Sequence, residues 1–192
     1  MKATKWKSYS LALIAGMSVL TACSSDDNND NGGNGNNGNG NEIENGTTLK
    51  GTITSDVTLT AGSTYKLSGE YIVEDGATLN IEAGVKIISI YDDIVDYILV
   101  KQGGKINAVG TSSAPIVMTS EKEEPGAWGG IHICGKAHTN AEGGKGSSEI
   151  GGATYGGNDD ADNSGTLKYV RVEYSGYAFD SEHEANGITF YG

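Results

Sequence analysis

Carboxylate and amide groups crowd residues 158–163, where Asp159, Asp160 and Asp162 lie between Asn158 and Asn163. Oxygen ligands of this kind suit Ca²⁺, so calcium binding is one hypothesis for the segment. The spacing matches neither the helix-loop-helix calcium consensus nor the glycine–aspartate nonapeptide repeat. A solvated acidic loop is therefore the favoured interpretation, and calcium, the one cofactor considered, is the alternative.

The only arginine of the chain, Arg171, has acidic neighbours that suit acid–base chemistry. The residues that follow it include four acids and one histidine, Glu173, Asp180, Glu182, Glu184 and His183. Arg171 and His183 are the candidate catalytic residues of this group. Alternating charges on a strand are more often a solvated face, and no nucleophile elbow, phosphate loop, dinucleotide fingerprint or zinc-protease motif is present.

His132 and Cys134 are two residues apart in a strand-like run, so they share a face opposite Ile131 and Ile133. Two soft ligands can begin a metal site, and His138 follows nearby. There is no CxxC and no second pair of ligands. We therefore expect a strand surface with ordinary polar residues.

Aromatic residues are frequent in the second half of the chain, and such rings either stack on sugars or cap the ends of a packed interior. The set is Trp128, Tyr155, Tyr169, Tyr174, Tyr177 and Tyr191. Trp128 stands beside two glycines and is expected to pack at a corner, and Tyr174 is also assigned to packing. Tyr155 and Tyr177 are expected to be exposed and are the candidate ligand-binding residues.

The charge balance limits the classes of partner. The whole chain carries a formal charge of −12, and without residues 1–22 it has 10 basic and 25 acidic residues, a charge of −15. An acidic chain does not favour nucleic acid or anionic lipid head groups. Neutral glycans, cations and proteins remain as possible partners.

An internal repeat decides the fold class. Residues 71–81 align with residues 98–108 at an offset of 27, with Gly76 on Gly103 and Asn80 on Asn107. Each unit contains three short strands separated by turns with glycine. This pattern predicts an all-β, right-handed parallel β-helix over residues 47–192. A β-sandwich would explain the alternation but not the recurrence.

Alternation also predicts which side chains face the interior. The expected inward residues are Leu79, Ile81, Val85, Ile87, Ile106, Ala108, Val170, Val172 and Tyr174. Residues 59–67 form a half-unit that is interpreted as an N-terminal cap. Residues 139–165 interrupt the repeat and are expected to be an insertion that builds a binding surface.

Three segments together resemble a widespread family of β-helical surface lipoproteins of Bacteroidota-type bacteria. They are residues 126–137, residues 110–120 and residues 167–176. The resemblance covers roughly residues 47–192 and implies the fold, but it carries no catalytic motif. Members of that family continue beyond the point equivalent to Gly192, so we expect the β-helix to be truncated in the middle of a coil.

The N-terminus carries an export signal. Three lysines precede a short apolar run, and residues 20–23 read Leu-Thr-Ala-Cys. This string resembles the lipobox of bacterial lipoproteins, which implies cleavage after residue 22, diacylglycerol on the Cys23 sulfur and an acylated amino end. The apolar run is too short to span a membrane. Residues 23–46, rich in Asn, Gly and Asp, are expected to be a disordered tether.

These observations predict a lipid-anchored protein of the outer membrane that faces the cell exterior. Its expected role is binding or adhesion toward glycan or matrix polymers, or toward a surface protein. One alternative is a polysaccharide lyase or hydrolase built on the β-helix, and another is a non-functional fragment of a longer surface protein. Catalysis inferred from the fold alone would be an analogy.

Overall fold

The structure is a computed structural model that describes residues 41–180 and 184–192. Apart from one short 3-10 helix, its regular elements are β-strands. No helix of the described residues is long and apolar enough to cross a membrane. Cys23 and His183 lie outside the described residues, as does most of the predicted tether.

The strands follow one another in five coils, each of which turns once around a shared interior. The first two coils are β1 (Asn41–Ile43) with β2 (Thr48–Ile53), and β3 (Val57–Leu59) with β4 (Thr64–Val73). The third is β5 (Thr78–Ile81), β6 (Lys86–Ser89) and β7 (Tyr97–Val100), and the fourth is β8 (Lys105–Val109), β9 (Ile116–Ser120) and β10 (Ile131–Cys134). The fifth is β13 (Gly165–Lys168), β14 (Val170–Val172) and β15 (Ile188–Tyr191).

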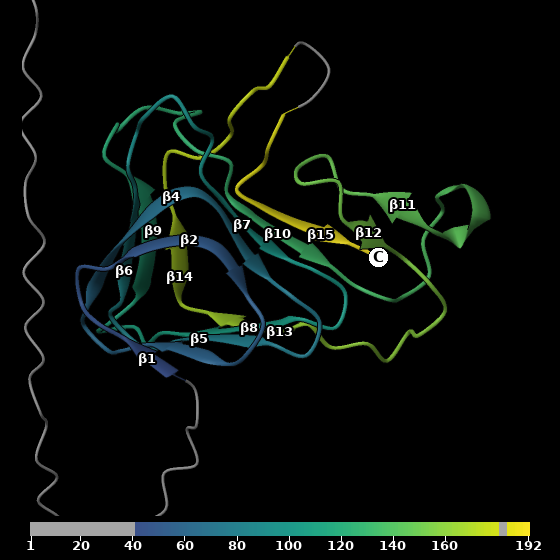
Figure 1. The fold of residues 1–192 in the computed structure, drawn as a ribbon, viewed down its shortest axis with the longest axis horizontal. Helices are drawn as coiled ribbons and strands as arrows, with labels where there is room; N and C mark the ends of the chain where they lie inside the picture. The colour runs from purple at the N-terminus through teal and green to yellow at the C-terminus, as the bar shows by residue number, and fades with distance from the viewer. Residues whose placement is uncertain (1–40, 181–183) are drawn as a thin grey trace, which may run out of the picture. The chain divides into compact units, whose positions relative to one another are not determined.

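The coils stack so that equivalent strands pair in parallel and form three faces (Figure 1). Face A contains β1, β3, β5, β8 and β13. The long strand β4 pairs with β6 through its first half and with β7 through its second half. We call the β6–β9–β14 side face B and the β7–β10–β15 side face C. The parallel β-helix predicted from the repeat is confirmed.

The pairing register also confirms the 27-residue repeat. Leu79 pairs with Ile106 and Asn80 pairs with Asn107, whose Nδ2 donates to the Asn80 Oδ1 over 3.2 Å. The interpretation of residues 59–67 as a cap is wrong, because they belong to a coil that pairs on both sides. Val57 pairs with Leu79 at a spacing of 22 residues, since this coil lacks the long corner loop of the next one.

The first strand begins earlier than the sequence indicated. β1 pairs in parallel with β3, so Asn41 lies opposite Val57. The segment was assigned to the tether because its side chains are polar. The structure pairs it through backbone hydrogen bonds, which do not depend on side-chain type.

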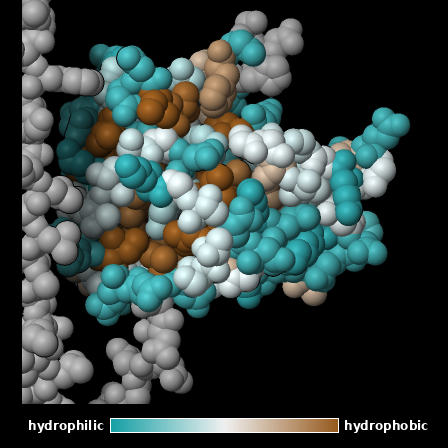
Figure 2. Space-filling view, in the orientation of Figure 1, coloured by the Kyte–Doolittle hydropathy of each residue, from teal (hydrophilic) through white to brown (hydrophobic). Residues whose placement is uncertain are grey.

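Apolar ladders fill the interior, and six of the predicted inward residues are at most 2% exposed: Leu79, Ile81, Val85, Ile87, Ile106 and Ala108. Val170 and Val172 are inward but only half-buried, because no strand of the described residues pairs with the outer edge of β14. Tyr174 is not part of the ladder, since it follows the end of β14 with φ at +60°. Figure 2 shows apolar residues in the middle of the face in view and mostly hydrophilic residues around them.

Two tyrosines in the interior are expected to differ in how removal of the hydroxyl changes the stability of the protein. The Tyr65 hydroxyl donates to the Ile43 carbonyl over 2.9 Å and accepts from the Thr60 amide over 3.0 Å. The Tyr71 hydroxyl is buried without a hydrogen-bond partner among the described residues, and burial raises its pKa to about 12.

We therefore expect Tyr65→Phe to lower the free energy of unfolding by about 1–3 kcal/mol, because it removes the partner of a main-chain amide and a carbonyl. Tyr71→Phe removes an unsatisfied hydroxyl and should leave stability unchanged or raise it by up to about 1 kcal/mol. Urea unfolding of the two variants measures both effects. A larger loss in Tyr71→Phe than in Tyr65→Phe would contradict the assignment of hydrogen bonds.

Candidate functional site

The outer side of face B brings the predicted Arg171 beside other cations. Arg171 pairs in register with Val117 and, one strand further, with Lys86. Lys66 lies in the adjacent row, opposite Ile88 of β6. Since parallel strands are about 4.8 Å apart, Lys86 and Arg171 stand about 10 Å apart along the stack. The alternation that points Val170 and Val172 inward points all three cations outward.

Two of these cations have carboxylate partners. The Lys66 Nζ lies 3.3 Å from the Glu121 Oε1, and the Arg171 Nη2 donates to the Glu173 Oε1. The side chains of Lys66 and Arg171 are 53% and 63% exposed, so these pairs contribute little to stability. They can exchange their partners for a ligand at small cost. The predicted group of Arg171 with His183 is not described, because His183 lies outside the described residues.

An exposed aromatic ring lies at the edge of face B. Tyr91 is 53% exposed and follows β6, and the Lys122 Nζ lies 4.4 Å from the centre of its ring. The same Nζ donates to the Tyr91 hydroxyl over 3.1 Å and pairs with Glu124 at 3.2 Å. These contacts, with Tyr91 first, raise the pKa of Lys122. The pair presents a ring face and a cation together.

The loops that join face B to face C all leave the same corner of the β-helix. They comprise residues 90–96, residues 121–130 and the described residues between β14 and β15, and each joins the face B strand of a coil to the face C strand of the same coil. Trp128, in the loop of residues 121–130, joins this loop to the one that follows β14. Its Nε1 donates to the Glu173 carbonyl over 2.7 Å, and the residue is only 1% exposed. The expected corner packing of Trp128 is confirmed.

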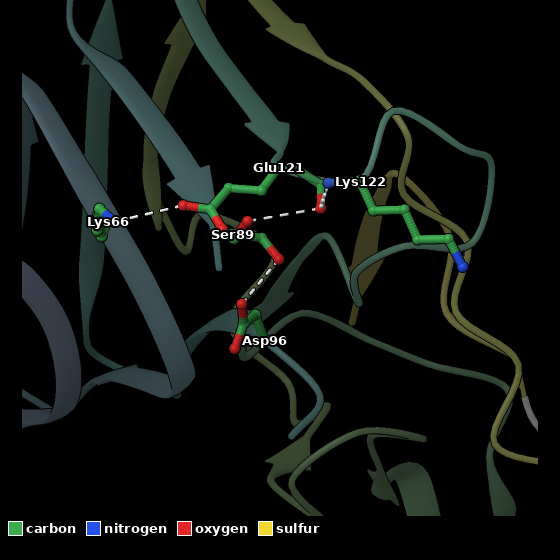
Figure 3. A network of polar contacts seen from close by, with 6 residues as sticks. Lys66, Ser89, Asp96, Glu121 and Lys122 are labelled. Atoms are coloured by element: carbon green, nitrogen blue, oxygen red, sulfur yellow. Dashed lines mark hydrogen bonds and ion pairs between the residues drawn. The ribbon is translucent and has the colours of Figure 1, made fainter. Parts of the chain in front are cut away.

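A buried carboxylate organises the base of this corner. The Asp96 Oδ1 accepts from the Gly69 amide over 2.5 Å, and its Oδ2 accepts from the Ser89 hydroxyl over 2.7 Å. Figure 3 shows Ser89 meeting Asp96 and, at the surface, the Glu121 side chain meeting Lys66. The Glu121 amide donates to the Ser89 carbonyl and so joins the two contacts. Burial, with a smaller effect of Asp92, raises the pKa of Asp96 against these hydrogen bonds.

Sequence reasoning missed Asp96 among the acids of an apparently ordinary loop. One signal was present, because Asp96 follows Gly69 by the same 27 residues that relate the repeats. The chain makes a tight corner at Gly69, which turns the Gly69 amide toward the loop inserted at the equivalent position of the next coil. That amide needs a hydrogen-bond acceptor from the loop. Asp96 is that acceptor.

Residues 135–164 connect β10 to β13 and cover the outer side of face C. They contain the predicted insertion, with the 3-10 helix η1 (Glu142–Gly144) and the small hairpin of β11 (Gly146–Ser147) and β12 (Thr154–Tyr155). Ile150 and Ala153 pack there in a second apolar cluster with Leu99. The expectation of a polar strand surface at His132 and Cys134 is wrong, because both are fully buried under this cover.

The two predicted ligand-binding tyrosines are half-buried rather than exposed, and both pack against the second apolar cluster. The Tyr155 ring stacks on Tyr191 with their centres 5.1 Å apart. Tyr177 meets Phe179 edge to face, also at 5.1 Å. The structure does not bring Tyr155 and Tyr177 into one ligand-binding group with Arg171, and their binding role stays a prediction.

The three predicted calcium ligands do not converge. The Asp159 Oδ1 accepts from the Ala161 amide, and the Asp162 Oδ2 accepts from the Lys136 amide over 2.9 Å. The Asp160 Oδ1 lies 2.6 Å from the His138 Nδ1. Among the described residues no group of three His, Cys, Asp or Glu side chains is placed to hold a metal ion. In this arrangement the carboxylates act as acceptors within the loop, and calcium binding stays a prediction.

Two hollows complete the description. A polar cleft of about 370 Å³ lies between the insertion and the corner at Glu74 and Lys101, which form an ion pair of 2.6 Å. A larger hollow of about 460 Å³ is lined by the buried Ile106 and Ile133, by the exposed Phe190, and by the polar residues 162–164.

The Asp96 network should be needed for the corner that carries Tyr91 and Lys122. Asp96→Ala leaves the Gly69 amide and the Ser89 hydroxyl without their acceptor, so we expect a loss of about 1–3 kcal/mol in unfolding free energy. Asp93→Ala removes an exposed carboxylate of the same loop and is the matched control. Equal stability of the two variants in urea unfolding would contradict the role assigned to Asp96.

A family model described as a pectate-lyase like beta helix domain matches residues 51–192. The match begins within β2 and covers the last four coils and the insertion. No curated protein and no solved structure matches the sequence.

Proposed function

The chain belongs to the family of pectate-lyase-like beta helix domains, and from that premise we propose that it binds glycan polymers at the cell surface. The observation that carries the proposal is the difference between faces B and C. The insertion covers face C, whereas face B keeps Lys66, Lys86 and Arg171 exposed in adjacent rows. Face B is therefore the surface offered to a long ligand.

The chemistry of face B suits a polymer of sugars. Its strands repeat at about 4.8 Å. Lys66 and Lys86 lie on neighbouring strands, and Arg171 follows two strands beyond Lys86. Ammonium and guanidinium groups donate strongly to hydroxyl and carboxylate oxygens. Tyr91 adds an exposed ring on which a sugar can stack, and Lys122 fixes the orientation of that ring.

The proposal includes the lipid anchor and the outer-membrane location. Their support is the lipobox-like string at residues 20–23 and the resemblance to surface lipoproteins of Bacteroidota-type bacteria. Acyl chains on Cys23 hold the protein at the membrane, since several chains anchor stably where one is marginal. The segment rich in Asn, Gly and Asp that follows Cys23 is the proposed tether.

A carbohydrate-active enzyme is the second candidate function. The observation that favours it is the contact of Arg171 with Glu173 on the uncovered face, which places a cation and a carboxylate within reach of one ligand. A lyase or hydrolase of this kind would release products from a polysaccharide. A binding module would leave the polymer intact.

Affinity electrophoresis in gels that contain soluble bacterial, plant or animal polysaccharides tests the binding proposal. We expect retardation by at least one of them, and we expect Arg171→Ala or Lys86→Ala to weaken it by roughly tenfold, because each removes a charge-assisted hydrogen bond. Lys105→Ala is the control, since Lys105 is exposed on face A. Equal weakening by all three substitutions would assign the effect to net charge and contradict a site on face B.

The same polysaccharides separate the two functions. Incubation with the protein should leave their chain length unchanged if the protein only binds. New reducing or unsaturated ends that disappear in Arg171→Ala, with retardation retained, would replace the binding proposal by the enzyme.

The anchor makes a separate prediction in the native host. Cys23→Ala removes the sulfur that carries the diacylglycerol, so we expect the protein to move from the membrane fraction to the soluble fraction. Immunoblots of the two fractions measure the change, and surface digestion of intact cells by a protease measures exposure. Retention of Cys23→Ala in the membrane would contradict lipid anchoring at this residue.

A further inference from the structure

His132 lies in the middle of the outer side of face C and is fully buried. Its Nε2 is 2.8 Å from the Gly129 carbonyl and its Nδ1 is 3.1 Å from the Tyr191 hydroxyl. A carbonyl only accepts, so the Nε2 carries the hydrogen and donates. The Nδ1 then accepts the Tyr191 hydrogen. Both ring nitrogens are satisfied by a neutral imidazole.

The groups that face His132 come from every element around it. Tyr97 of β7 meets its ring edge to face at 6.5 Å, and Tyr191 of β15 stacks on it at 6.0 Å. The Tyr97 hydroxyl is already engaged, since it donates to Glu70 over 2.9 Å. Cys134 follows on the same strand, buried and uncharged. From the insertion, Glu149 is the one carboxylate that favours a charge on His132.

The cover over His132 is a short segment with few backbone bonds to the coils. We call residues 146–156 the strap. It rests on face C through Ile150 and Ala153, through the stacking of Tyr155 on Tyr191, and through Gly156, whose amide donates to the Gly135 carbonyl over 2.9 Å and whose carbonyl accepts from the Gln102 Nε2 over 2.8 Å. The Ser148 side chain also meets Cys134, and the Glu149 backbone meets Tyr191. Its own hairpin has only two residues in each strand. Segments held this sparsely open at a low free-energy cost.

We propose that the strap is a pH-sensitive cover, which leaves face C when His132 takes up a proton in mild acid. A protonated ring donates from both nitrogens, so the Tyr191 hydroxyl can no longer donate to the Nδ1 and must turn its hydrogen away to accept instead. Tyr191 is also the ring on which Tyr155 of the strap stacks. Protonation therefore acts on the contact that joins the strap to β15. Opening hydrates the charged ring and exposes Leu99 and Cys134.

The direction follows from linkage. Burial lowers the pKa of His132 in the covered state, and the Gly129 and Glu149 contacts oppose this effect only in part. The covered state is thus favoured above the pKa of the exposed ring, and its advantage falls as the pH drops below that value. Opening that binds one proton becomes up to about tenfold more favourable for each pH unit in that range.

Cys134 reports the opening directly, because it is fully buried under the strap and is the only cysteine of the described residues. The full chain with Cys23→Ser is labelled with a dithiopyridine reagent, which reacts in acid as well as at neutral pH. Each rate is divided by the rate of the unfolded chain at the same pH. We expect this ratio to rise by roughly tenfold from about pH 7.5 to about pH 5.

Two substitutions identify the titrating group. His132→Gln can keep both hydrogen bonds and does not titrate, so its labelling ratio should be independent of pH. His138→Asn removes the exposed histidine of the insertion and should keep the rise seen in the parent chain. A ratio that is equal at both pH values in the parent chain overturns the proposal. A rise that persists in His132→Gln, or that disappears in His138→Asn, also overturns it.

Hydrogen exchange of the parent chain gives a measurement that does not depend on a substitution. After correction for the intrinsic rate, the amides of residues 146–156 should lose protection in mild acid while those of β8 and β9 keep theirs. Loss of protection in β8 and β9 to the same degree would mean global unfolding and would overturn a movement confined to the strap.

Discussion

Hydrogen bonding between coils is the interaction on which this structure depends. A strand of one coil cannot satisfy its amides and carbonyls within that coil, so it pairs with the coils on either side. The Lys86 amide, for example, donates to the Ser63 carbonyl of the preceding coil, and the Val117 amide donates to the Val85 carbonyl in turn. Each coil therefore fixes the register of the next. The inward ladder of Leu79 and Ile106 and the outward ladder of Asn80 and Asn107 are both consequences.

The corners are not bound by this pairing between coils. The loops inserted at the corners therefore determine how the faces differ. At the corner between faces B and C, a tight bend at Gly69 in one coil is replaced by loops in the later coils. Such loops need internal anchors, because the ladder no longer orders them. Asp96 and Trp128 supply these anchors through main-chain partners, and the exposed Tyr91 and Lys122 lie on the surface that they support. At the corner between faces C and A, the long insertion folds back and removes face C from solvent.

The repeat and the alternation were sufficient to predict the coils, because backbone pairing and inward packing act at fixed spacing along the chain. Prediction failed where spacing is not fixed. Residues 59–67 resemble a cap in the sequence because their coil has no long loop and returns after 22 residues instead of 27. The burial of His132 depends on a segment that follows it by more than ten residues. The residues next to His132 therefore give no pattern that predicts its burial. Tyr155 was expected to be exposed for the same reason.

The distribution of charge shows why the composition of a solenoid is a weak guide to its ligand. The chain carries a formal charge of −12, yet the outer side of face B gathers Lys66, Lys86 and Arg171. Charges further apart than about 8–10 Å are largely screened at physiological salt, so the local potential at face B is set mainly by nearby groups, among them these cations and their partners Glu121 and Glu173. Among the described residues no carboxylate lies within ion-pair distance of Lys86, so no ion pair holds this side chain. The net charge of the chain acts on solubility and approach, whereas the alternation along each strand decides which side chains face outward on face B.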